Sequence, residues 1–131
     1  MKYEKTPTIC NICGGTVKYV NNSLIYGKEY GSGWCYFCIN CNAYVGTHED
    51  SPETALGILA NREMREMKMK CHALFDKKWK NHKQRTFEYR KLASRLHIPL
   101  SECHFGYFDM EMLNRAYKIL EREETHNGRK V

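Results

Sequence analysis

The chain has 131 residues, of which 42% are hydrophobic and 27% are charged, and its formal net charge at pH 7 is +6. This length favours one domain or two small modules, and the ordinary charge content argues against global disorder. No apolar stretch approaches the roughly 20 residues that a membrane helix needs, and Met1–Lys5 lacks the apolar core of a signal peptide. We therefore expect a cytoplasmic protein that does not enter a membrane.

Residues 1–50 predict a small module of β-strands. Short runs rich in Val, Ile and Tyr, at 16–20, 24–26 and 43–45, alternate with Gly and Asn clusters, as in strands joined by hairpins. Because so few residues cannot build a stable core from strands alone, we expect a metal ion to supply stability. Residues 48–57 are polar for the most part and contain Pro and Gly, and we predict a linker over residues 51–60.

Five of the seven cysteines lie between residues 10 and 41 at Cys-x-x-Cys spacings. In a chain without a signal peptide, such clustering favours metal binding over disulfide bonds. A structural zinc ion takes four ligands in a tetrahedron, and two Cys-x-x-Cys knuckles supply two ligands each. Cys10 and Cys13 form the first knuckle, in which Gly14 favours the positive φ of the turn.

The second knuckle has two overlapping choices, because Cys35, Cys38 and Cys41 are each three residues apart. We assign Cys38 and Cys41, since Asn42 then follows the knuckle, and we interpret Cys35 as an apolar strand residue. A role for Cys35 in the metal site remains the alternative. One structural zinc ion is predicted, with the ligands Cys10, Cys13, Cys38 and Cys41, and such a closed site leaves no position open for substrate.

Beyond residue 60 the apolar residues recur at the three- and four-residue spacing of helices. Residues 61–123 predict three helices packed as a small helical subdomain, and residues 124–131 predict a frayed tail. Thr86 is expected to cap the second helix and Asp109 the third. The sequence therefore predicts an α+β fold, in which a zinc-ribbon-like β module precedes the helices.

The positive charge is concentrated in the first half of this helical subdomain. Residues 62–95 carry 12 Lys or Arg and 4 Asp or Glu, whereas residues 1–61 carry 4 and 5, and residues 96–131 carry 5 and 6. Binding of nucleic acid needs such charge to neutralise phosphates and often adds aromatic residues for stacking. The predicted nucleic-acid-binding residues are Arg62, Arg65, Lys77, Lys78, Lys80, Lys83, Arg85 and Arg90. The alternative is an ordinary solvated surface.

A second polar cluster is predicted from four residues of the helical subdomain. His72 and Asp76 are four residues apart on one helix, and His104 and Asp109 precede the last helix. Together they could hold a catalytic metal ion or supply an acid–base pair. We favour structural roles, with Asp109 as a helix cap, because no His-Glu-x-x-His spacing accompanies them.

Several motifs in the same order resemble a zinc-finger-containing family of bacterial and phage proteins. The resemblance covers about Cys10 to Leu120. It rests on the first knuckle and on Cys38-x-x-Cys41-x-Ala43-Tyr44-Val45-Gly46-x-His48, His72-x-x-Phe75-Asp76-x-x-Trp79-Lys80 and Cys103-His104-x-Gly106-x-Phe108-Asp109. Members of the family lack a cysteine matching Cys35, which implies that Cys35 lies outside the metal site. The resemblance implies zinc binding and a phage context but no reaction mechanism.

These observations predict a phage- or prophage-type zinc-binding accessory protein in the host cytoplasm. We expect it to be non-catalytic and to bind nucleic acid or a nucleoprotein through its basic helical surface. One alternative is a protein–protein module, such as an inhibitor of a host enzyme or defence complex. The second alternative is a metal-dependent hydrolase that uses His72, Asp76, His104 and Asp109.

Overall fold

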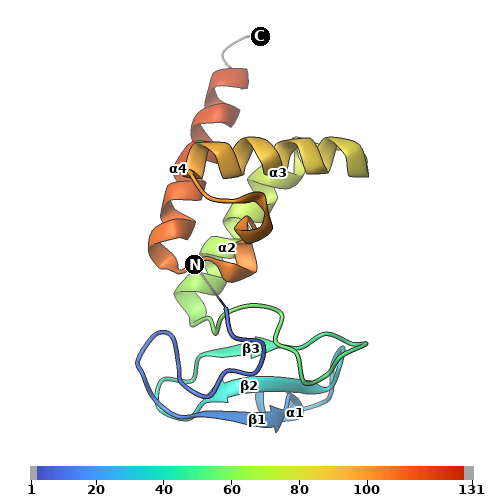
Figure 1. The fold of residues 1–131 in the computed structure, drawn as a ribbon, viewed down its shortest axis with the longest axis vertical. Coiled ribbons are helices and arrows are strands. Elements are labelled where there is room, and N and C mark those ends of the chain that lie inside the picture. The colour runs from blue at the N-terminus through green and yellow to red at the C-terminus, as the bar shows by residue number, and fades with distance from the viewer. Residues whose placement is uncertain (1–2, 129–131) are drawn as a thin grey trace. The chain divides into compact units, whose positions relative to one another are not determined.

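A computed structural model describes residues 3–128 and divides the chain into two compact units between Glu63 and Met64 (Figure 1). The first unit contains strands β1 (Val17–Asn21), β2 (Trp34–Cys38) and β3 (Tyr44–Gly46), with a short helix α1 (Ser23–Tyr26). The long helices that follow are α2 (Arg62–Asp76), α3 (His82–Leu96) and α4 (Met110–Gly128). Two 3-10 turns, η1 (Leu100–Glu102) and η2 (Phe105–Tyr107), join α3 to α4. The predicted α+β fold with a zinc-ribbon-like start is therefore confirmed.

The three strands form an antiparallel sheet in the order β1-β2-β3. Val17 lies opposite Cys38 and Tyr19 lies opposite Tyr36, so these four side chains share one face. Cys35 lies on the other face because successive residues of a strand alternate. The face with Val17, Tyr36 and Cys38 forms the buried core of the first unit.

Residues 51–60, which the sequence predicts as a linker, pack onto this core instead. Ala55 and Leu59 are fully buried, and Ala60 forms a β-bridge with Tyr44. The side chain of Asn11 accepts a hydrogen bond from the Leu59 N–H at 2.9 Å and donates one to the Leu59 carbonyl at 3.0 Å. The segment packs here because a sheet of three short strands needs another layer over its apolar face.

The helical unit has a core of aromatic and aliphatic side chains. The ring of Phe75 in α2 lies 5.6 Å from the ring of Phe105, which lies 5.8 Å from the ring of Phe108. Leu113 of α4 is fully buried, and its carbonyl oxygen lies 3.6 Å from the thiol sulfur of Cys71. No helix in the described range 3–128 is long and apolar enough to cross a membrane.

The ends of α3 and α4 test the predicted caps. Asn81, not Thr86, caps α3, because its side-chain oxygen accepts the Gln84 N–H at 2.9 Å; the Thr86 cap was wrong. Asp109 accepts the Met112 N–H at 2.9 Å, which confirms it as the cap of α4. Helix α4 continues through most of the predicted frayed tail to Gly128, and residues 129–131 lie outside the described range.

Candidate metal centre

Two knuckles of the same backbone geometry carry the four predicted zinc ligands. In the first, the Gly14 N–H donates to the Cys10 carbonyl at 3.0 Å, and the Cys10 N–H donates to the Gly15 carbonyl at 2.9 Å. In the second, the Asn42 N–H donates to the Cys38 carbonyl at 2.9 Å. Gly14 and Asn42 hold the equivalent left-handed position, with φ of +76° and +66°. Gly and Asn are the residues that adopt this conformation at least cost.

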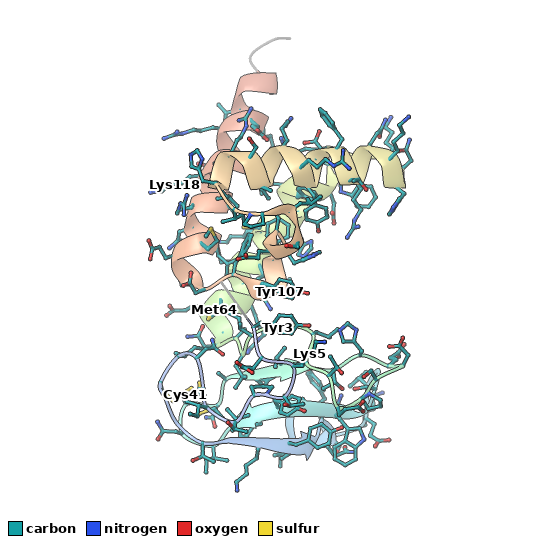
Figure 2. The ribbon with its side chains drawn as sticks, viewed as in Figure 1. Tyr3, Lys5, Cys41, Met64, Tyr107 and Lys118 are labelled. Atoms are coloured by element: carbon teal, nitrogen blue, oxygen red, sulfur yellow. The ribbon has the colours of Figure 1, made fainter. Side chains whose placement is uncertain are left out.

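The knuckles bring the four sulfur atoms together. The Sγ atoms of Cys10 and Cys41 lie 3.7 Å apart, those of Cys13 and Cys38 lie 3.5 Å apart, and all four lie within 4.8 Å of one another. A zinc ion with four Zn–S bonds of about 2.3 Å would place its sulfur ligands about 3.8 Å apart. The four cysteines therefore fit one tetrahedral zinc ion, and Figure 2 labels Cys41 at this cluster.

Polar N–H groups lie close to the sulfur atoms of Cys10 and Cys13. The Ile12 N–H lies 3.4 Å from the Cys10 sulfur. The Asn40 amide and the Gly15 N–H each lie 3.3 Å from the Cys13 sulfur. These two hydrogen bonds, that of Asn40 first, lower the pKa of Cys13 to about 6. Cys13 is therefore ready to bind a cation at neutral pH.

The surroundings of Cys41 oppose its ionisation. The Ala43 backbone N–H lowers the pKa of Cys41, but desolvation and the three neighbouring thiols outweigh it and raise this pKa to about 12. A divalent cation offsets this effect, because its positive charge stabilises the thiolate, the form in which cysteine ligates a metal. A cation bound at the centre would therefore favour the thiolate form of Cys41.

Two residues that support the site are not apparent from the sequence pattern. Gly15 lies against the centre, where an added Cβ would meet the Asn40 Cβ at 2.8 Å and the Cys13 sulfur at 3.1 Å. Asn40 occupies one of the two variable positions of the second knuckle. The only sequence signal for Gly15 is that it follows Gly14; Asn40 has none.

Cys35 does not take part in the centre. Its side chain lies on the opposite face of the sheet from Cys38 and is 1% exposed. Burial raises the pKa of the Cys35 thiol to about 11, so it remains protonated. The interpretation of Cys35 as an apolar strand residue agrees with this placement.

Two Cys-x-x-Cys knuckles on a three-stranded antiparallel sheet define a zinc-ribbon-like, zinc-binding module. Residues 6–123 match a family model described as DUF3268, a zinc-finger-containing domain, and the chain belongs to this family. No curated protein and no solved structure matches the chain.

The second predicted polar cluster does not assemble as a metal site. The four cysteines are the only group of three or more Cys, His, Asp or Glu residues whose ligand atoms converge within residues 3–125, whose side chains the structure describes. His72 packs edge-on against Phe105, with 4.7 Å between ring centres, and His104 packs against Tyr107 at 4.8 Å. Because Asp109 caps α4, the hydrolase alternative loses its proposed ligand set.

The eight predicted nucleic-acid-binding residues fall into different environments. Lys78 forms an ion pair with Glu123, and Lys77 pairs with Glu124 at 3.4 Å. Arg85 lies over the rings of two aromatic residues, whereas Arg62 and Arg65 lie at the start of α2. The remaining members are exposed and make no ion pair with any residue of the described range: Lys80, Lys83 and Arg90.

Proposed function

We propose that this zinc-stabilised protein binds nucleic acid through one exposed face of α3 and has no catalytic activity. The observation that carries the proposal is the spacing of Lys83, Phe87 and Arg90, which are four and three residues apart and therefore share one side of the helix. All three side chains are exposed, and that of Phe87 is 61% exposed. In proteins that bind single strands, basic side chains contact the phosphates while an accessible aromatic ring stacks on a base.

The composition of α3 supports the same proposal. The helix contains five Lys or Arg residues and one Glu, and Lys80 stands just before it. The ammonium group of Lys91 also lies 5.9 Å from the ring of Phe87. A polyanion would therefore meet a net positive charge along this helix, although Lys91 pairs with Glu88 at 3.4 Å and Arg95 pairs with Glu123 at 2.6 Å.

The broader context belongs to the proposal as well. The family resemblance supports an accessory role in a phage or prophage, acting in the host cytoplasm. The partner would be DNA, RNA or a nucleoprotein, since phosphate contacts are common to all three.

A protein–protein module is the second candidate function, and one surface of the first unit favours it. Tyr19 and Trp34 are both exposed, and their rings stack with 4.9 Å between centres at an angle of 5°. Exposed aromatic pairs are typical of protein interfaces. Glu53 contributes electrostatically to the raised pKa of Tyr19, so a negative charge acts on this aromatic pair. That charge would attract a basic peptide and repel a nucleic acid.

The test uses the zinc-loaded full chain and short oligonucleotides of DNA and RNA. Replacing Lys80, Lys83 and Arg90 by Gln is expected to weaken binding and to flatten the slope of log affinity against log salt. Each lost contact with duplex DNA changes this slope by about 0.9, so three contacts change it by about 2.7. The matched control removes the same charge elsewhere, at Lys18, Lys28 and Lys118, and is expected to leave the slope nearly unchanged.

Phe87→Ala separates stacking from charge. It should weaken binding to single strands by about 1–3 kcal/mol without changing the salt slope. If the wild-type protein shows no salt-dependent binding to either nucleic acid, the proposal fails and the protein–protein module takes its place.

A further inference from the structure

Three elements of the helical unit bring basic side chains to one aromatic cluster. His72 comes from α2, Arg85 from α3, and His104 from the residue before η2. The Arg85 guanidinium carbon lies 4.8 Å from the centre of the Tyr89 ring, which lies 6.0 Å from the His104 ring and 6.3 Å from the Phe105 ring. The His72 ring lies 4.7 Å from the same Phe105 ring. Contacts with the rings of Tyr89 and Phe105 therefore connect the three basic groups, and His104 also packs against Tyr107, which Figure 2 labels.

Arg85 is a half-buried cation that lacks an acidic partner. It forms no ion pair with any Asp or Glu of residues 3–128, and its guanidinium lies 3.4 Å from the Tyr89 hydroxyl. The guanidinium also lies 5.6 Å from the ring of Trp79, whose buried Nε1–H has no acceptor within that described range. Planar guanidinium groups with free N–H donors favour carboxylate and phosphate oxygens.

The two histidines lie in the field of this cation. Desolvation, and then Arg85, lowers the pKa of His104. Desolvation also lowers the pKa of His72; Asp76 opposes this effect, while Lys68 and Arg85 add to it. Both rings are exposed at their outer edges even though they pack on aromatic neighbours. An anion bound next to these rings would raise the pKa of both histidines, because it stabilises the protonated imidazole.

We propose that Arg85, His72 and His104 form a binding site for a phosphate group. The inference rests on the proposed function, since the phosphate would belong to the backbone of the bound nucleic acid. The guanidinium donates two N–H groups to phosphate oxygens, and each protonated imidazole adds a charge-assisted hydrogen bond. Asp76 is the nearby negative charge that competes with the phosphate at His72.

This arrangement makes binding depend on pH. The phosphodiester keeps its single negative charge near neutrality, whereas each imidazole must gain a proton to bind it best. Affinity therefore increases as the pH falls from 8 to 6, by at most about tenfold per pH unit for each histidine that takes up a proton. Asp76→Asn removes the competing charge and is expected to tighten binding.

The first arm of the test measures oligonucleotide affinity at pH 8 and pH 6 with constant ionic strength, using the zinc-loaded full chain. The double variant His72→Asn and His104→Asn should lose the increase at pH 6. His97→Asn is the matched control, because Asn accepts the left-handed backbone of that position (φ +59°). A pH-independent wild type, or an increase that survives in the double variant, overturns the proposal.

Arg85 gives a separate readout at a fixed pH. Arg85→Gln should weaken binding at least tenfold, whereas Lys118→Gln, which removes one charge from α4, should change it little. If Arg85→Gln does not fold, Arg85→Lys keeps the charge without the planar fork and should still lose most of the affinity. Wild-type affinity in both Arg85 variants contradicts the assignment.

The second arm separates this site from the proposed function. Inorganic phosphate is added at pH 6 while the ring signals of His72 and His104 are followed by NMR. Shifts of both signals, absent in Arg85→Gln, support the site even if no oligonucleotide binds, in which case the proposed function alone fails. Oligonucleotide binding without these shifts and without pH dependence overturns the site and leaves the proposed function standing.

Discussion

The two units of the chain reach stability by different physical means. The first unit has three short strands and a core that includes Cys10 and Cys38, so two residues of the zinc site are part of its hydrophobic centre. The core of the helical unit consists instead of packed side chains, among them the rings of Phe75 and Phe105. The comparison shows that a small sheet can replace apolar volume by metal–ligand bonds, whereas three helices do not need to.

The same residue type therefore has opposite roles in the two units. Cys13 lies beside N–H donors and has a pKa lowered to about 6. Burial among apolar side chains instead raises the pKa of Cys71 and of Cys103 to about 11. Spacing decides the role, because only paired cysteines can direct two thiolates at one ion.

The largest effect should come from breaking the metal centre. Cys38→Ser should abolish the binding of one zinc ion per chain and unfold the first unit, since structural zinc contributes on the order of 10 kcal/mol to small zinc modules. Metal analysis and the NMR dispersion of residues 3–63 check this. Cys35→Ser is the control and should keep the zinc; its loss would show that the second knuckle is assigned wrongly.

The core of the helical unit should give the next largest effect. Phe105→Ala removes a fully buried ring that contacts Phe75, Phe108 and His72, and we expect a loss of about 3–5 kcal/mol. Chemical denaturation followed by helix content measures it. Zinc content should remain at one ion per chain, and a simultaneous loss of zinc would contradict the separation of the two units.

A smaller effect is expected from the amide that supports Cys13. Asn40→Ala removes the main cause of the lowered pKa of Cys13, so zinc should bind about 10–100-fold more weakly. Competition with a chelator of known affinity gives the value. The pH at which half the zinc is released should move upward, because the thiol is harder to deprotonate. Unchanged affinity and pH dependence would mean that the Asn40 contact does not support the thiolate.

The smallest effect concerns the pH dependence of stability in the absence of nucleic acid. Folding lowers the pKa of His72 and His104 below the ordinary value of 6.5. Their contribution to stability is therefore present above pH 6.5 and is lost as the pH falls through the folded-state pKa values. The double Asn variant should lessen the decrease of Tm in this window by no more than a few degrees, because solvent screens exposed rings. If Tm decreases as steeply in the double variant as in the wild type, other titratable groups cause the decrease.

Local patterns in the sequence correctly predicted the fold class and the cluster of four cysteines that is able to hold one zinc ion. Cys-x-x-Cys spacing and an acidic cap at Asp109 depend on a few neighbouring residues, so they can be recognised without the fold. The Thr86 cap failed because Asn81 stands in a polar run where several residues are able to cap. The ion pairs of Lys77 and Lys78 with Glu124 and Glu123 join residues more than 40 positions apart, and no local pattern predicts them.

The placement of residues 51–60 was missed for a similar reason. The segment begins with the polar residues 51–54, as a linker would, but Ala55, Leu59 and Ala60 are buried, and Ala55 and Leu59 belong to the core of the first unit. The run Ala-Leu-Gly-Ile-Leu-Ala at 55–60 is too short for its periodicity to distinguish a strand from a helix. The supporting roles of Gly15 and Asn40 likewise follow from the distance between knuckles, which only the folded chain defines.

One NMR titration tests the central claim, that zinc stabilises one unit while the other binds nucleic acid. A short oligonucleotide is added to the isotope-labelled, zinc-loaded chain, and a chelator follows. The account predicts that the oligonucleotide shifts the signals of α3 around Lys83, Phe87 and Arg90, and that the chelator collapses residues 3–63 but leaves those shifts in place. Oligonucleotide shifts confined to residues 3–63, or their disappearance together with the zinc, would contradict it.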